Sequence, residues 1–163
     1  MDGKQLNILL VYGEGGHHDQ AIRLLGLMRS LDSSLNFVHI TDSEIMKVEG
    51  EEIYSAPPLR HKNASFDPVL FIGSYWRAAL LTFKLQRKYR FNAVIGFGPG
   101  VCIPVFMMCR LLNVRKRIFF EDWCRFTSKS LSGKACTPLS TKVFVQNESL
   151  KELYHHAEFA GRL

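Results

Sequence analysis

Three glycines and two adjacent histidines stand together near the start of the chain, in the segment VYGEGGHHDQ at positions 11–20. Such a turn could hold a metal ion, a dinucleotide or another phosphorylated ligand, because glycine lets the backbone come close to a ligand and imidazole binds metals and carries protons. A dinucleotide fingerprint needs the pattern GxGxxG, and here His18 stands where the third glycine belongs. The chain also has no GxxxxGK sequence followed by serine or threonine. We therefore predict neither nicotinamide binding nor P-loop chemistry.

Zinc is a second possibility for this turn. His17, His18 and Asp19 resemble the His-Pro-Asp-Asp turn of zinc-dependent sugar deacetylases, which also follows a first strand. Those enzymes need an unbroken acid pair and a later HxxH pattern, whereas the later histidines of this chain, His155 and His156, are adjacent. Consecutive helical residues point about 100° apart, so two adjacent histidines do not easily meet one ion. We expect no metal and no cofactor, and we keep a self-sufficient zinc-dependent sugar deacetylase or hydrolase as an alternative function.

Two further clusters could take part in chemistry, namely GFGPG at 96–100 and EDWCRF at 121–126. Each follows an apolar run that is typical of a buried strand, as the first cluster does. In an open parallel sheet, ligands bind beyond the carboxyl ends of the strands, so we expect the three clusters to lie at one edge. A tight turn without a ligand is the alternative for each glycine cluster taken alone.

The elements that must position these clusters alternate between strand and helix. The run LNILLVY at 6–12 predicts a buried strand, and DQAIRLLGLMRSL at 19–31 predicts an amphipathic helix with Asp19 as its N-cap. Further elements complete four or five strands with intervening helices: strands at 35–40, 92–96, 116–122 and 141–147, and helices from about Ser74, at 101–113 and at 148–156. This pattern predicts an α/β fold with a Rossmann-like parallel sheet and flanking helices.

Length and composition agree with one domain over residues 1–163, interrupted by a long polar loop at about 41–68. A formal charge of +6 favours anionic surfaces such as phospholipid or lipid phosphates. Nucleic acid is not an expected partner, because no RNP-like strand or recognition helix stands out. The four cysteines match no CxxC pair, which indicates reduced thiols and a cytosolic compartment. The first residues, MDGKQLNILL, are typical of neither a signal peptide nor a membrane anchor.

The helix expected from about Ser74 combines an apolar face, aromatic residues such as Trp76, and basic residues such as Arg77 and Lys84. Such a helix could lie in a membrane surface. The alternative is an ordinary core helix with a solvated basic face.

Several motifs occur together in one order: GEGGH, GFGPGVCIP, FFEDWCRFTSKSLSGK, and VFVQNESLKELY followed by FAGRL. With these motifs the chain resembles the oligosaccharide-biosynthesis family that contains asparagine-linked glycosylation protein fourteen and its bacterial PssD-type exopolysaccharide relatives. The resemblance extends from about Leu6 to Leu163.

The resemblance implies half an enzyme. Members of this family are similar to the N-terminal, acceptor-binding half of a GT-B glycosyltransferase, and a separate donor-binding glycosyltransferase subunit supplies the UDP-sugar. The implied acceptor is a polyprenyl-diphosphate-linked sugar, used in polysaccharide or lipid-linked oligosaccharide biosynthesis. The implied location is the cytoplasmic face of the membrane, with peripheral attachment, since the membrane anchor of the eukaryotic member has no counterpart here. The chain should be inactive alone.

The resemblance also places the site residues. His17 is the candidate base, with the alternative that it only orders its turn, and Glu121 is a second candidate base, with the alternative of a structural ion pair with Arg125. Glu14 replaces the usual small residue, which brings a carboxylate beside the expected phosphate site. The implied acceptor- and phosphate-binding residues are Gly13, Gly15, Gly16, Gly98, Gly100 and Arg125. A further alternative function is a pure membrane scaffold that recruits the partner without touching the acceptor.

Overall fold

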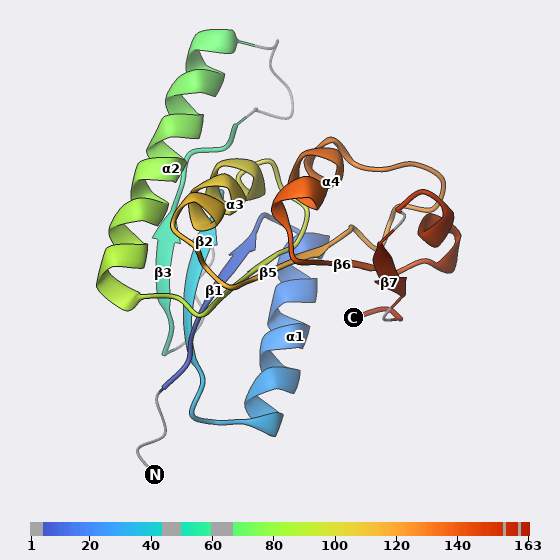
Figure 1. The fold of residues 1–163 in the computed structure, drawn as a ribbon, viewed down its shortest axis with the longest axis horizontal. Coiled ribbons are helices and arrows are strands. Elements are labelled where there is room, and N and C mark those ends of the chain that lie inside the picture. Colours follow the sequence, from blue (N-terminus) through green and yellow to red (C-terminus); the bar gives the residue numbers. More distant parts are fainter. Residues whose placement is uncertain (1–4, 44–49, 60–66, 155, 160) are drawn as a thin grey trace.

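Residues 5–43, 50–59, 67–154, 156–159 and 161–163 are described in a computed structural model. Within them, seven strands form one parallel sheet in the order β3-β2-β1-β4-β5-β6-β7 (Figure 1). The strands are β1 (Asn7–Tyr12), β2 (Asn36–Thr41), β3 (Glu52–Ser55), β4 (Ala93–Gly96), β5 (Lys116–Phe120), β6 (Lys142–Val145) and β7 (Ala157–Phe159).

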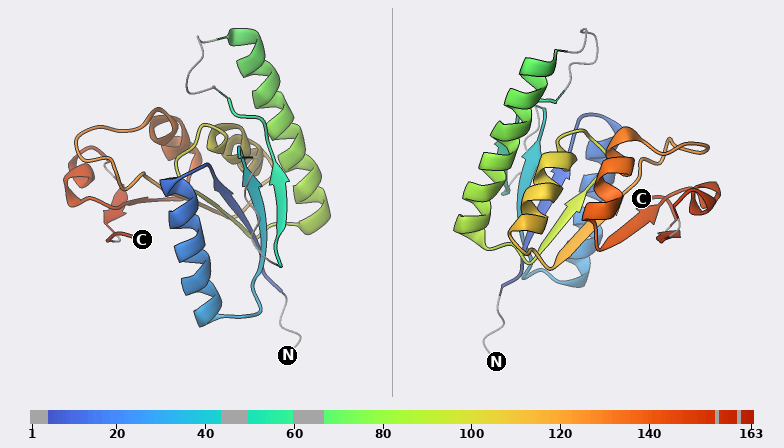
Figure 2. Two further views of the ribbon diagram at one scale, coloured as in Figure 1. Left: turned by 180° about the vertical axis from the view of Figure 1, so that it is seen from behind. Right: turned by 45° about the horizontal axis from the view of Figure 1, so that its top comes forward.

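Helices cover both faces of this sheet (Figure 2). They are α1 (Gly16–Leu31), α2 (Pro68–Tyr89), α3 (Cys102–Leu111) and α4 (Leu131–Cys136), with short 3-10 turns η1 (Thr137–Leu139) and η2 (Glu148–Glu152). Alternate residues of β1 point to opposite faces: Leu10 packs with α1, and Leu9 packs in the larger core under α2 and α3. The predicted α/β class with a Rossmann-like parallel sheet is confirmed, although with seven strands instead of four or five.

The strand order reverses between β1 and β4. From β1 the chain proceeds outward to β2 and β3, and it then returns to place β4 on the other side of β1. The turns that follow β1 and β4 are therefore neighbours, and the Phe97 amide donates to the Val11 carbonyl at 2.9 Å to join them. In doubly wound sheets, this reversal is where the carboxyl ends of the strands leave room for a ligand.

Two helices begin at other residues than predicted. Helix α1 begins at Gly16, with Gly15 as its N-cap at a positive φ of 65°, so the prediction of Asp19 as the cap was wrong. Helix α2 begins at Pro68 instead of about Ser74, because the Asp67 carboxylate accepts the amide hydrogens of Val69 and Leu70 and proline suits a first turn.

The range 41–68, for which the sequence predicts a long loop, contains β3, which pairs in parallel with β2. Residues 44–49 and 60–66 of that range lie outside the described residues. At the other end of the chain, the helix predicted at 148–156 is only the 3-10 turn η2, and β7 follows it as an edge strand. His155 lies outside the described residues. In the part of the chain that the structure describes, no helix is long and apolar enough to cross a membrane.

Candidate functional site

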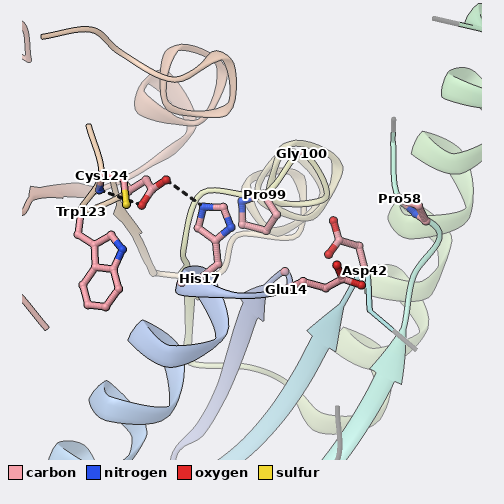
Figure 3. A pocket seen from close by; sticks show the side chains of 11 residues that line it. Glu14, His17, Asp42, Pro58, Pro99, Gly100, Trp123 and Cys124 are labelled. Carbon is pink, nitrogen blue, oxygen red and sulfur yellow. Dashed lines mark hydrogen bonds and ion pairs between the residues drawn. The ribbon is translucent and has the colours of Figure 1, made fainter. Parts of the chain in front are cut away.

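A pocket of about 500 Å³ opens at the carboxyl edge of the sheet, where the strand order reverses (Figure 3). The turn after β1, the turn after β4 and the loop after β5 contribute to its walls, so the three clusters expected from sequence do meet. The chain beyond β2 and β3 completes the lining. The lining residues are Gly13, Glu14, Gly16, His17, Asp42, Pro58, Pro99, Gly100, Asp122, Trp123 and Cys124.

The glycine turns allow these walls to come together closely. A Cβ on Gly13 would lie 2.8 Å from Asp42 Oδ1, and a Cβ on Gly16 would lie 3.0 Å from Trp123 Nε1. The first distance is shorter than real Cβ contacts and the second is tighter than most, so a larger residue at either position would require the side chain of Asp42 or Trp123 to shift. Glycine at these two positions is therefore favoured by the packing of the pocket walls, independently of any ligand.

The second glycine turn approaches the histidine directly. Gly98 has φ 85°, a conformation that favours glycine, and a Cβ there would lie 2.8 Å from His17 Nε2. The carbonyl of Gly98 accepts a hydrogen bond from Ser132 Oγ in α4. The hydrogen bond from α4 thus holds the turn after β4 in place, and the absence of a side chain at Gly98 leaves room for the imidazole of His17.

His17 faces an acid across the pocket. Its Nε2 lies 3.6 Å from Asp122 Oδ2, and the two side chains are 26% and 24% exposed, so both are accessible to a ligand (Figure 3). His17 belongs to the first turn of α1, where the positive end of the helix dipole also lies. This pair can accept a proton on the imidazole and stabilise the resulting imidazolium through the carboxylate.

The pocket is acidic. Three carboxylates line it, from Glu14, Asp42 and Asp122, and among its lining residues there is no lysine or arginine. Glu14 and Asp42 lie at the end of the pocket remote from Trp123 (Figure 3). The side chains therefore offer mainly hydrogen-bond acceptors, which suit the hydroxyl groups of a sugar, and the amino terminus of α1 offers a favourable dipole to an anion.

The residues predicted to bind acceptor or phosphate are only partly in this lining. Gly13, Gly16 and Gly100 line the pocket, and Gly15 and Gly98 shape the two turns without being part of the lining. Arg125 is exposed and lies outside the lining, with its guanidinium 3.5 Å from Ser128 Oγ.

Glu121 does not reach the pocket. It is fully buried, and its carboxylate accepts hydrogen bonds from the Asp122 amide, from the amide and hydroxyl of Ser130, and from the Tyr154 hydroxyl. Burial, together with the bond to Glu121, raises the pKa of Tyr154 above its usual range. The carboxylate therefore links the start of α4 and the segment around Tyr154 to the end of β5. This geometry favours the structural alternative for Glu121, although through Ser130 and Tyr154 instead of the expected pair with Arg125.

The loop after β5 is held by side chains of the later QNES segment. Asn147 Nδ2 donates to the carbonyls of Trp123, at 2.7 Å, and of Arg125, and Ser149 Oγ donates to the carbonyl of Phe126 at 2.7 Å. Gln146 Nε2 donates to the Glu121 carbonyl at 3.0 Å. These bonds fix the backbone that carries Asp122 and Trp123 into the pocket.

The neighbouring His18 lies outside the pocket lining. Its ring packs 5.6 Å from the ring of Tyr12, whose hydroxyl bonds the fully buried His39 Nδ1 at 3.0 Å. Burial, with smaller contributions from Arg29 and His18, lowers the pKa of His39 to about 4. His18 is thus engaged with side chains outside the pocket lining, with Tyr12 and, at 3.5 Å, with Asp19.

Among the described residues, no three histidine, cysteine, aspartate or glutamate side chains are grouped so that they could hold a metal ion. Among the lining residues, Asp42 was not singled out from sequence, and Asp122 and Trp123 were included only as members of the EDWCRF cluster. The signal was present, since Asp42 and Asp122 stand just beyond the apolar runs of β2 and β5, where a parallel sheet presents ligand-binding groups.

Comparison with known proteins matches the family model described as "Oligosaccharide biosynthesis protein Alg14 like" to residues 8–163. The human UDP-N-acetylglucosamine transferase subunit ALG14 is 30% identical over 186 residues, which cover 98% of this chain and 84% of the human protein. MurG of Acinetobacter baumannii superposes with a TM-score of 0.69 at 14% identity, over 88% of this chain and 42% of MurG. A UDP-N-acetylglucosamine 2-epimerase superposes with a TM-score of 0.71 at 9% identity, over 98% of this chain and 49% of the epimerase.

Proposed function

The chain belongs to the Alg14-like family of oligosaccharide biosynthesis proteins, and from this premise we propose that it is the acceptor-binding subunit of a two-component UDP-N-acetylglucosamine transferase. The acceptor is a polyprenyl-diphosphate-linked sugar, and a second protein binds the UDP-sugar. The complex acts at the cytoplasmic face of a membrane, to which this subunit recruits its partner. Bacterial PssD-type proteins would be functional relatives.

In fold, the chain resembles part of two larger solved structures. It matches 42% of MurG and 49% of the epimerase. We assign residues 1–163 to one Rossmann-like domain that corresponds to the N-terminal half of a GT-B glycosyltransferase. The pocket at the carboxyl edge then faces the donor-binding partner across the active-site cleft.

One observation carries this proposal: His17 and Asp122 meet in a pocket formed by the turns after β1, β4 and β5. In the proposed reaction, a hydroxyl oxygen of the acceptor sugar bonds to the anomeric carbon of the donor while the bond from that carbon to UDP breaks. The hydroxyl proton passes to His17, and Asp122 stabilises the imidazolium. Glu121 acts as a positioning residue, because it braces the backbone next to Asp122.

The acidic lining limits where the diphosphate of the acceptor can bind. The acceptor sugar fits the carboxylate-lined interior, and the diphosphate lies near the amino terminus of α1 and the glycine turns, with Arg125, Lys129 and Lys134 as outer cations. Glu14 stands in the first glycine turn itself, and its side chain is directed toward Asp42 (Figure 3).

Reconstitution tests the proposal. The purified chain should transfer no sugar from UDP-N-acetylglucosamine to a polyprenyl-diphosphate-linked N-acetylglucosamine, and addition of the donor-binding partner should start transfer. His17→Ala in the complex should lower kcat by roughly 10²- to 10⁴-fold, the usual contribution of a general base, while His18→Ala serves as the matched control. A pure scaffold would keep full activity with His17→Ala. Robust turnover by the chain alone would overturn the proposal, and turnover that a chelator abolishes would favour the zinc enzyme.

A further inference from the structure

Helix α2 has a second apolar stripe that faces away from the protein. Val69, Ile72, Trp76 and Leu80 follow one another at intervals of three or four residues, so they lie on one side of the helix. They are 76%, 56%, 57% and 55% exposed. The core instead receives Ala78, Ala79, Thr82 and Leu85, which are the buried residues of this helix.

A surface helix normally needs one apolar stripe, directed at the core. Single exposed apolar residues are common, but a continuous row of four large side chains is typical of a surface that is covered by something else. The first turns of α2 also stand beyond the carboxyl edge of the sheet, at the edge where the pocket opens (Figures 1 and 3). None of the residues from Pro68 to Arg77 is buried.

The charges of α2 indicate what covers the stripe. Between Pro68 and Tyr89 the helix has four basic residues and no acid. Arg77 and Lys84 are exposed and lie one after the other along the flank of the stripe, two turns apart. Asp67, at the helix end, is engaged with the amides of the first turn. An apolar stripe with a cationic flank is complementary to the apolar layer and anionic headgroups of a phospholipid bilayer.

The aromatic side chains suit the same environment. Trp76 lies with its ring 6.0 Å from that of Tyr75, and Tyr75 in turn contacts Met107 of α3 through its hydroxyl at 3.0 Å. Tryptophan and tyrosine favour the level of the headgroups, where one end of the side chain is wet and the other is apolar. Met107 is itself 41% exposed, so an exposed apolar side chain of α3 lies beside Tyr75.

We propose that α2 lies in the surface of an anionic phospholipid bilayer, with Val69, Ile72, Trp76 and Leu80 inserted and with Arg77 and Lys84 on lipid phosphates. The orientation that follows brings the mouth of the pocket to the membrane surface, where a lipid-linked acceptor would present its sugar. Only this last step rests on the proposed function; the docking itself rests on the stripe and its charges.

Vesicle binding by the full chain tests the docking. The wild-type protein should co-sediment with vesicles of phosphatidylcholine and phosphatidylglycerol, and less with phosphatidylcholine alone. The double variant I72S/W76S should lose roughly tenfold or more in partition coefficient, because two large apolar side chains no longer leave water. The matched control L31S/L111S removes side chains that are 86% and 67% exposed at the distant ends of α1 and α3, and it should bind as the wild type does.

A second pair of variants tests the charges. R77Q/K84Q should weaken binding to the anionic vesicles by roughly tenfold or more and remove most of the preference for them, since each basic residue near the surface contributes about 1 kcal/mol. The control K116Q/K151Q removes two exposed lysines elsewhere and should leave the preference intact. Fluorescence of Trp76, measured in a Trp123→Phe background, should be quenched by brominated lipids.

Other occupants give different results. Absence of vesicle binding by the wild type, or equal loss in L31S/L111S, would overturn the proposal. If I72S/W76S instead converted a dimer to a monomer without any vesicle binding, the stripe would be an interface between copies. Transfer assays with the reconstituted complex separate the two proposals. If only the docking is wrong, I72S/W76S transfers normally to a membrane-embedded acceptor. If only the proposed function is wrong, the chain binds vesicles, but neither a membrane-embedded nor a water-soluble short-chain acceptor is used.

Discussion

Glu121 and Asp122 are consecutive acids at the end of β5, and the protein uses them in opposite ways. Glu121 points under α4, is fully buried and accepts hydrogen bonds from Ser130 and Tyr154. Asp122 points to the pocket, is 24% exposed and lies opposite His17. Successive residues of an extended chain point to opposite sides, so one backbone position separates a structural carboxylate from one that can meet a ligand.

The histidines show the same division. His17 lines the pocket, whereas His39 is fully buried in β2, bonded to the Tyr12 hydroxyl and with its Nε2 3.7 Å from Glu51 Oε2. Buried polar groups of this kind stabilise the fold only as long as their partners remain. Changes to the buried Glu121 and His39 should therefore affect stability, whereas changes to His17 and Asp122 in the pocket should affect activity.

Loss of the buried carboxylate should have the largest effect on stability. Glu121→Ala should lower the free energy of unfolding by about 3–5 kcal/mol, because it leaves several buried donors without an acceptor and opens a cavity. Urea denaturation of the purified chain measures this change. The matched variant Asp122→Ala should cost less than about 1 kcal/mol, as is usual for partly exposed residues. Equal losses for both acids would remove the distinction.

Acidification should destabilise the protein through His39. The pKa of His39 is lowered to about 4 from the ordinary 6.5, so the unfolded chain binds a proton that the folded one refuses between these values. Stability is therefore fully present above about pH 6.5 and falls as the pH approaches 4, by about 3 kcal/mol at most. Burial raises the pKa of Glu51 and opposes this trend.

Urea denaturation at several pH values, with His39→Gln as the reference, isolates the contribution of this histidine. The variant should show a shallower loss of stability between pH 6.5 and 4. His18→Gln, which changes the partly exposed neighbour, should keep most of the slope. A slope unchanged in His39→Gln would show that other groups cause the acid sensitivity.

Two glycines offer a smaller and sharper comparison. A Cβ on Gly133 would overlap Tyr154 Oη and Glu121 Oε2, whereas a Cβ on the pocket-lining Gly100 would lie 3.5 Å from Leu59, an ordinary contact. Gly133→Ala should cost about 1–3 kcal/mol of stability, as for overpacked cores. Gly100→Ala should cost less than about 1 kcal/mol, because neither its backbone nor its surroundings require glycine. Thermal unfolding of both variants measures the difference.

The fold was accessible from sequence because each buried strand is a compact apolar run followed by a turn, as in LNILLVY and NAVIG. The strand β3 was missed because its four residues lie at the sheet edge and are only partly buried, so they have no apolar pattern. The start of α2 was missed because its first turns are apolar without being part of the core, and only the Asp67 cap reveals them.

The site was accessible in part. The glycine turns and His17 stand out because their residue types are unusual, and the meeting of three clusters follows from the parallel sheet. The separate orientations of Glu121 and Asp122 could not be read from sequence, because they depend on where β5 ends and on the packing of Ser130, Gly133 and Tyr154 behind it. The role of His18 likewise depends on its ring contact with Tyr12.

Asp122→Asn is the smallest change that tests the contrast between the structural Glu121 and the pocket-facing Asp122. Stability should change by less than about 0.5 kcal/mol, because the retained amide oxygen can still accept the Cys124 amide that now bonds Asp122 Oδ1 at 3.1 Å. In the complex with the donor-binding partner, kcat should fall about tenfold, equivalent to about 1.4 kcal/mol, since the imidazolium of His17 loses its carboxylate. In a His17→Ala background the same change should cost nothing further, because the two residues act as one unit. An independent loss in that background would mean that Asp122 contacts the acceptor itself, so that the pocket holds two separate polar groups instead of a pair.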